Sequence, residues 1–368
     1  MSMAPLGAWG RKDSGVKPSR EEGLSEFLDG RLSWAELADR PAISGISILM
    51  TYQCPATCDH CVFHSAPGRT ETVDLETARA LIEAASRQQP PPSVSFSGGE
   101  PFLRLEMMKD LAAESRRRGM AWEVISSSSW CRSATQARDV LGDLQRLGLE
   151  TYCTSIDRFH LRYVPFRRMR FAVNAALELG IRVVINTMAD PALGGREREF
   201  LAETLDLPLE TVTGLRVNVM KTVPAGRAVE RVSDFLYRVK DLREGCPFST
   251  DVVTLSPEGL LYPCCGMVIG EKPAAGLFVQ DNLSGKNADD VAAVLKALKS
   301  DLFFKLLQVL GPYRVLEILK ARHPELVTRD RYVGGCDVCL EFVRNPGVVR
   351  ATEEFLAEAG RRLAAPQR

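Results

Sequence analysis

The sequence lacks three features that would assign a protein to a common functional class. Its 47 basic and 47 acidic side chains leave no net charge, so nothing marks it as a partner of nucleic acid or of an anionic membrane. Its longest apolar runs, such as GISILM, are far shorter than the ~20 residues of a membrane helix. The N-terminus also lacks the apolar core of a signal peptide. We therefore expect a cytoplasmic protein with neither a nucleic-acid nor a membrane partner.

Internal repeats and low-complexity tracts are also missing, whereas cysteine is abundant, with ten residues. A chain of 368 residues without a signal peptide should meet reducing conditions, where clustered cysteines are more often metal ligands than disulfides. Cys131 and Cys153 stand apart and are interpreted as buried small hydrophobic residues. The other eight occupy patterned positions: Cys54, Cys58, Cys61, Cys246, Cys264, Cys265, Cys336 and Cys339.

The chain divides into an N-terminal appendage, an alternating region and a third region. Residues 1–44 carry two capping-box patterns that predict short helices. From there to about residue 230, apolar strand candidates alternate with helical segments, which predicts parallel βαβ units with their chemistry at the C-terminal ends of the strands. The expected strands are 45–51, 93–97, 122–127, 149–155, 182–188 and 215–221, and the main expected helices are 75–87, 104–118, 135–147 and 167–179.

After residue 230 the alternation stops. Residues 251–264, DVVTLSPEGLLYPC, predict a hairpin, because two apolar runs flank a Pro-Glu-Gly turn. Residues 287–325 predict two helices, which Gly311 and Pro312 separate.

The first cysteines follow the first expected strand, in the stretch MTYQCPATCDHCVFHS. Four thiolates would complete a zinc or iron–sulfur site, whereas three leave one metal position open. A structural zinc site is the alternative, but such sites usually join two C-x2-C pairs. A [4Fe–4S] cluster on Cys54, Cys58 and Cys61 would leave one iron free for a substrate or cofactor.

With this C-x3-C-x2-C motif, the sequence resembles the radical S-adenosylmethionine (SAM) superfamily. The resemblance implies an α/β fold with a partial (β/α)6 TIM-like barrel, in which the open iron of the triad cluster chelates SAM. It also implies reductive cleavage of SAM to a 5′-deoxyadenosyl radical, which takes a hydrogen atom from the substrate. The family usually has an aromatic residue before the third cysteine, near the adenine. Here that residue is His60, whose imidazole can still stack.

Further segments match the family in chain order. Gly98-Gly99-Glu100 resembles its GGE segment, in which glycines permit close backbone approach and a carboxylate can accept from the ammonium group of SAM. Alone, these residues could equally form a turn. The third strand ends in serines where relatives often have Thr-Asn-Gly. The residues that the resemblance implies for SAM are His60, Gly98, Gly99, Glu100, Ser126, Ser127, Ser155 and Asn186, and Asp157 is a candidate substrate contact.

The second cysteine set resembles the SPASM and twitch subgroup of this superfamily. The segment PAGRA at 224–228 resembles the linker after the barrel, and Cys246-x12-Gly259-x4-Cys264 resembles the opening of the auxiliary domain. With Cys336 and Cys339, four ligands would hold one auxiliary [4Fe–4S] cluster. A four-thiolate zinc ribbon is the alternative. The expected domains are an N-terminal helical extension at 1–44, a radical SAM core at 45–230, and a small α+β twitch/SPASM-like domain at 231–368 with a helical insertion at about 277–330.

Cys265 is a surplus thiol beside Cys264. It is either a buried neighbour or a hydrogen-atom donor of the kind that radical SAM epimerases use, and Cys131 and Cys153 compete for that role.

The resemblance implies an enzyme that epimerises, crosslinks or oxidises a ribosomally made peptide, with SAM, two [4Fe–4S] clusters and a flavodoxin- or ferredoxin-type reductant. One alternative is a dehydrogenase or epimerase of an aminosugar or another small molecule. The other is a non-catalytic metal-binding scaffold, against which the intact triad and GGE segment argue.

Overall fold

The computed structural model describes residues 43–364, except 232–245, 247–248, 267 and 272–275. Apart from its last two residues, the N-terminal extension expected at 1–44 therefore lies outside the described residues.

Six parallel strands form the first part of the sheet, in chain order. Each lies within a residue or two of the range that its apolar pattern predicts. The strands are β1 (Gly45–Leu49), β2 (Ser93–Ser97), β3 (Trp122–Ser126), β4 (Leu149–Ser155), β5 (Arg182–Met188) and β6 (Leu215–Met220).

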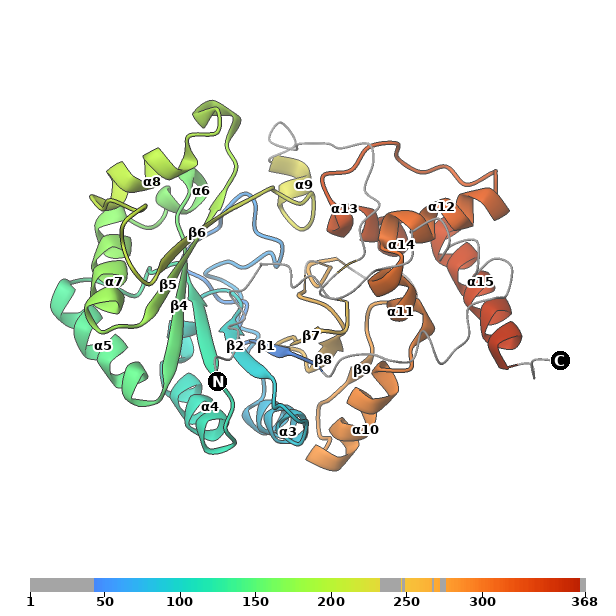
Figure 1. Cartoon of the computed structure of the whole chain (residues 1–368), viewed down its shortest axis with the longest axis horizontal. Coiled ribbons are helices and arrows are strands. Elements are labelled where there is room, and N and C mark those ends of the chain that lie inside the picture. The colour runs from blue at the N-terminus through green and yellow to red at the C-terminus, as the bar shows by residue number, and fades with distance from the viewer. Residues whose placement is uncertain (1–42, 232–245, 247–248, 267, 272–275, 365–368) are drawn as a thin grey trace.

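Helices connect these strands and cover the outer side of the sheet (Figure 1). Local sequence sets their ends: the Asp74 carboxylate accepts from the Thr77 N–H at 2.8 Å at the start of α3, and Gly180, at φ +71°, follows α7. The helices are α3 (Leu75–Ser86), α4 (Leu105–Arg117), α5 (Ala134–Arg146), α6 (Arg158–Leu161), α7 (Phe166–Glu178) and α8 (Glu197–Leu205). This parallel α/β architecture confirms the predicted fold class.

The predicted hairpin forms, and it extends the barrel sheet. Strand β7 (Val252–Leu255) pairs in parallel with β1, on the side opposite β2. Strands β8 (Leu260–Tyr262) and β9 (Asp281–Asn282) then continue antiparallel, so the sheet order is β6-β5-β4-β3-β2-β1-β7-β8-β9. The strand that leads into the first cysteines is therefore paired on both edges.

The C-terminal helices gather on the other half of the molecule (Figure 1). The helical stretch expected at 287–325 contains three helices rather than two, because Asp301 caps an additional start, accepting from the Phe304 N–H at 3.2 Å. The helices after β6 are α9 (Ala228–Arg231), α10 (Ala288–Leu298), α11 (Leu302–Val309), α12 (Pro312–Arg322), α13 (Gly335–Cys339), α14 (Glu341–Arg344) and α15 (Pro346–Ala364).

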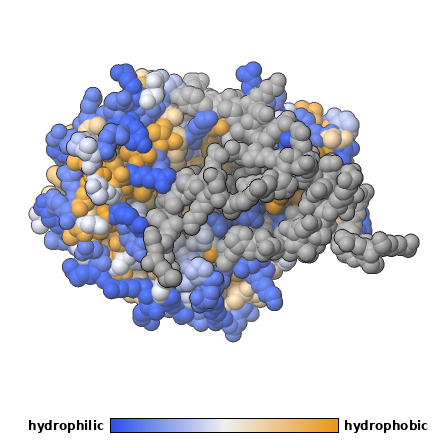
Figure 2. Space-filling view, in the orientation of Figure 1, coloured by the Kyte–Doolittle hydropathy of each residue, from blue (hydrophilic) through white to orange (hydrophobic). Residues whose placement is uncertain are grey.

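Among the described residues, no helix combines the length and the apolar character that a membrane span requires. On the face in Figure 2, hydrophilic side chains occupy much of the outer rim of the barrel half.

Candidate active site

A cavity of about 220 Å³ lies at the C-terminal ends of the parallel strands. The last residue of each strand from β2 to β6 lines it: Ser97, Ser126, Ser155, Met188 and Met220. Parallel α/β sheets place their ligands at this edge, because the loops that follow the strands converge there.

Cys54, Cys58 and Cys61 line this cavity together, and none of them forms a disulfide. Cys54 and Cys58 are buried, and burial raises the pKa of Cys54 to about 12 and that of Cys58 still further. Without metal these thiols are therefore protonated, and binding of iron would deprotonate them. Three cysteines that line one cavity fit a cluster with one open position.

Gly98 and Gly99 also line the cavity, and their main chain packs directly on the start of the cysteine loop. The Gly99 N–H donates to the Thr51 carbonyl at 2.7 Å. A Cβ atom on Gly98 would lie 2.5 Å from that carbonyl oxygen, and one on Gly99 would lie 2.2 Å from the Gln53 carbonyl oxygen. The glycines are thus required by contact between two backbones, whether or not a ligand also approaches them.

Glu100 is fully buried behind the cavity wall, within a cage of serines. Its carboxylate accepts from the Ser126 hydroxyl at 2.8 Å, the Ser127 N–H at 3.1 Å and the Ser129 hydroxyl at 3.1 Å. Burial raises the pKa of Glu100, and the serine donors oppose that rise. Here Glu100 orients Ser126 and Ser127, which do line the cavity; its direct contact with SAM stays a prediction.

His60, Asp157 and His160 form a polar cluster around the buried Asp157, and their ligand-type atoms all lie within 4.8 Å of one another. Asp157 caps α6 and contacts Nδ1 of His160 at 3.0 Å. Burial alone would raise the pKa of Asp157, but His160 and His60 hold it below its usual range. Both histidines line the cavity and Asp157 does not. His160, three residues further on, is thus the residue of this segment that reaches the cavity, and a direct substrate contact by Asp157 stays a prediction.

The ring of His60 is suited to stacking. Burial lowers its pKa to about 4, so the ring is neutral at pH 7, and it lies 4.8 Å from the ring of Phe159.

Three residues of the cavity wall carry buried polar atoms that have no hydrogen-bond partner in the described structure. These atoms are Nδ1 of His60, Oγ of Ser65 and Oγ1 of Thr222. Buried polar atoms are nearly always paired, because leaving one unpaired costs roughly 1–3 kcal/mol. Three such residues around the cavity that the cysteines line fit a polar ligand such as SAM.

Of the other predicted SAM contacts, Ser155 lines the cavity, whereas Asn186 is used within the sheet. The Asn186 side-chain oxygen accepts from Nδ2 of Asn218 at 3.1 Å, which links β5 to β6. The prediction for Asn186 remains untested.

Sequence reasoning missed several polar residues of the wall, among them His160 and Arg227. Arg227 donates through Nε to the Cys58 carbonyl at 3.0 Å and through a terminal nitrogen to the Ser65 carbonyl at 2.7 Å. Its position inside the PAGRA segment was the available signal, because a cation within a motif beside a thiol site suggests a role there.

The second cysteine set gathers away from this cavity. Cys339 interacts electrostatically with Cys246, Cys264 and Cys265, and the thiols of Cys336 and Cys265 are hydrogen-bonded to each other. Burial raises the pKa of Cys339 well above its usual value. Five thiols thus converge where the sequence predicted four ligands. Cys265 belongs to this group and is not part of the cavity wall, so its role as a hydrogen-atom donor stays a prediction.

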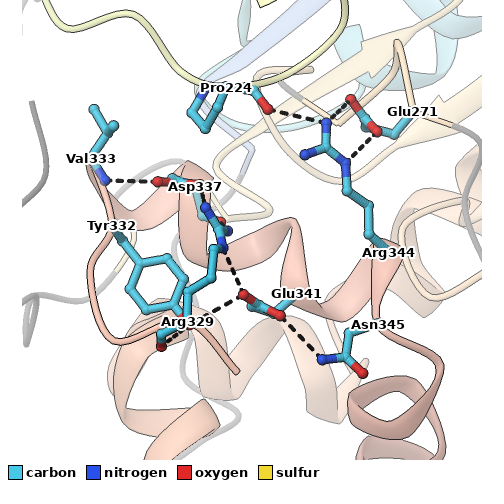
Figure 3. A network of polar contacts seen from close by, with 9 residues as sticks. All are labelled: Pro224, Glu271, Arg329, Tyr332, Val333, Asp337, Glu341, Arg344 and Asn345. Carbon is cyan, nitrogen blue, oxygen red and sulfur yellow. Dashed lines mark hydrogen bonds and ion pairs between the residues drawn. The ribbon is translucent and has the colours of Figure 1, made fainter. Parts of the chain in front are cut away.

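A buried ionic network holds the helical turn that carries Cys336 and Cys339 (Figure 3). Asp337, between the two cysteines, is fully buried and accepts from Arg329 at 2.6 Å and from the Val333 N–H at 2.8 Å. Arg329 also donates to Glu341 at 2.9 Å. One guanidinium therefore compensates two buried carboxylates, as buried charges require.

Comparison with protein families agrees with this geometry. Residues 48–205 match the model of the radical SAM superfamily, a range that contains the triad, the GGE segment and strands β2 to β5. Residues 48–205 are therefore a radical SAM domain, and the chain that carries it is a radical SAM enzyme. The recognition made from the cysteine triad is thereby confirmed, together with the SAM and the [4Fe–4S] cluster that the family implies.

Individual relatives are distant. The chain is 24% identical to the putative peptide biosynthesis protein YydG of Bacillus subtilis (strain 168), over 61% of this chain and 70% of that protein. It is 30% identical to the Fe-coproporphyrin III synthase of Methanosarcina barkeri (strain Fusaro / DSM 804), over 37% of this chain and 36% of that protein.

Among solved structures, native anSMEcpe with bound AdoMet and Cp18Cys peptide aligns with a TM-score of 0.52 at 13% identity. The alignment covers 87% of this chain and 98% of that one. This likeness is one of fold, and it extends beyond the region of the family model.

Proposed function

We propose that this enzyme modifies a ribosomally made peptide at a C–H bond. The observation that carries the proposal is the cavity at the strand ends, whose wall contains the three cysteines and three residues with unpartnered polar atoms. Cys54, Cys58 and Cys61 hold a [4Fe–4S] cluster there. The chemistry that the bound groups supply is one-electron cleavage of SAM and removal of a hydrogen atom from the substrate.

The chain's own residues divide the remaining tasks. His60 offers a neutral ring to the adenine, and Ser126 and Ser127, oriented by Glu100, offer hydroxyls to the polar groups of SAM. His160, held by Asp157, is the polar group nearest the substrate. The apolar side chains of Met188 and Met220 keep water from this end of the cavity.

A peptide substrate is favoured over a small molecule on two grounds. The relative YydG is described as a peptide biosynthesis protein, and the structure of anSMEcpe contains a bound peptide. Cys246, Cys264, Cys336 and Cys339 hold the auxiliary [4Fe–4S] cluster, with Cys265 as the candidate hydrogen-atom donor to the substrate.

The test uses anaerobically reconstituted protein, SAM, dithionite and the product of any short reading frame beside the gene. We expect about eight irons and eight sulfides per chain, 5′-deoxyadenosine release, and a modified peptide. In D2O, epimerisation through a thiol donor would place one deuterium on the peptide without a change in oxidation state, whereas crosslinking would lower its mass by two hydrogens.

Turnover of an aminosugar in place of the peptide would establish the alternative substrate class. About one zinc with about four irons would make the second thiol group structural. Absence of both iron and deoxyadenosine would refute the proposed site.

A further inference from the structure

The segment at 224–228, which follows β6, is bonded directly to the loop of the first cysteines. Besides the two side-chain bonds of Arg227 to the carbonyls of Cys58 and Ser65, the Arg227 N–H donates to the Cys61 carbonyl at 3.1 Å. Three carbonyls of the cysteine loop thus depend on one residue of the linker.

Two glycines bring the backbones of these segments into contact. A Cβ atom on Gly226, which has φ +56°, would lie 2.5 Å from the Cys61 carbonyl oxygen. One on Gly270 would lie 1.7 Å from the Val62 carbonyl oxygen. No larger residue fits either place without moving the backbone, so the cysteine loop has neighbours on two sides that fix its position.

An ion pair between Arg344 and Glu271 connects the C-terminal helices to the segment at 224–228 (Figure 3). Arg344 donates from Nε to one oxygen of Glu271 at 2.7 Å and from a terminal nitrogen to the other at 2.5 Å. The same nitrogen donates to the Pro224 carbonyl at 3.1 Å, and Glu271 accepts from the Gly226 N–H at 2.9 Å. Arg344 therefore contacts both the linker and the carboxylate that holds it.

Arg344 ends α14, which follows directly after the α13 turn that carries Cys336 and Cys339. Bonds from Arg329 to Asp337 and Glu341 fix that turn on its other side. A continuous path of contacts thus leads from the second thiol group, through Arg344, Glu271 and Gly226, to the backbone of the triad loop.

We propose that Arg344 and Glu271 are a positioning pair that sets the triad loop relative to the second thiol group. Neither residue lines the cavity. They act through Gly226 and Arg227, which hold the carbonyls of Cys58 and Cys61. The inference concerns the relation between the two thiol groups, and it depends on the proposed SAM site only for its second readout.

The geometry of the pair favours a fixed position over a loose surface contact. Bidentate guanidinium–carboxylate contacts define orientation as well as distance. The Glu271 side chain is 13% exposed and that of Arg344 is 35% exposed, so solvent screens the pair only in part. Burial would raise the pKa of Glu271, but Arg344 and the Gly226 N–H hold it below its usual value, so the carboxylate is ionised at neutral pH.

The first measurement is hydrogen–deuterium exchange on full-length, anaerobically reconstituted protein. In Arg344→Met we expect about tenfold faster exchange at 57–67 and 225–228, with the central strands unchanged. The matched control is Arg322→Met, which removes another partly exposed ion pair of the same half, Arg322 with Glu358 at 2.6 Å. Arg344→Lys keeps the charge and one contact, and should recover part of the protection.

The second readout is SAM binding, by equilibrium dialysis, together with the electron paramagnetic resonance signal of the reduced triad cluster. Arg344→Met should bind SAM about tenfold more weakly and broaden the SAM-induced change of that signal, while Arg322→Met should match the wild type.

Equal exchange at 57–67 in both methionine variants would overturn the proposal, as would acceleration spread evenly over the strands. If Arg344→Met shows the expected faster exchange but the wild type does not bind SAM, the proposed function is contradicted and the positioning role of the pair stands.

Discussion

The first three cysteines come from one short loop after β1 and line an open cavity, whereas the second group collects five thiols from three separate segments of the chain. In the triad, sequence spacing brings the sulfurs together, and cavity space is left beside them. In the second group, tertiary packing and the ion pairs of Arg329 with Asp337 and Glu341 bring the sulfurs together. The difference teaches that local spacing can encode a site within one loop, while a site shared by three segments depends on tertiary contacts.

The sharpest way to break this comparison is to remove one thiol from each group. Cys58→Ser should lose about half of the iron and all measurable 5′-deoxyadenosine formation, a fall of at least about 100-fold. Cys339→Ser should also lose iron, yet still cleave SAM when no substrate is present, because the triad is intact. Metal analysis and chromatography of the products check this. Equal loss of SAM cleavage in both variants would contradict the division between the groups.

A smaller effect is expected from Arg329→Met, which leaves the Asp337 and Glu341 carboxylates buried without a cation. Breaking such a network typically costs about 3 kcal/mol. We expect the free energy of unfolding in urea to fall by that amount and iron to be lost from the second group first. Arg322→Met is the control, with an expected loss below about 1 kcal/mol. A stable Arg329→Met protein with full iron content would show that the network does not support the turn.

The smallest effect concerns the pH dependence of the Arg344–Glu271 ion pair, which lies between the two thiol groups. The folded-state pKa of Glu271 lies below its ordinary value, so its contribution to stability is present at neutral pH and is lost as the pH falls through that lowered pKa. Glu271→Gln should therefore be less stable than the wild type by about 1 kcal/mol at pH 7, and the difference should shrink in acid. Urea unfolding of both metal-free proteins over this pH range measures it. A constant difference would exclude ionisation as its cause.

The strands and the triad could be predicted from the sequence because their signals are local. Apolar runs of five to seven residues fixed β1 to β6 closely, and the C-x3-C-x2-C spacing is readable without any fold. Asp74 as a cap of α3 was found for the same reason.

The roles of Glu100 and Asp157 could not be predicted in the same way. Whether a carboxylate faces a cavity or a cage of serines depends on which residues the neighbouring strand end brings to it. The pairing of β7 with β1 was equally hidden, because strand partners far apart in sequence leave no periodic signal.

The position of β1 has a consequence for how the protein is made. Because β1 pairs with both β2 and β7, the strand that presents the cysteine loop lacks one neighbour until residues 252–255 have left the ribosome. Iron inserted earlier would enter a loop whose sheet is unfinished. For the same reason, a fragment ending near residue 230 would expose one edge of β1, and an open apolar strand edge favours aggregation. The sheet that supports the first cysteine loop is therefore complete only when the half of the chain that carries the second thiol group has been made.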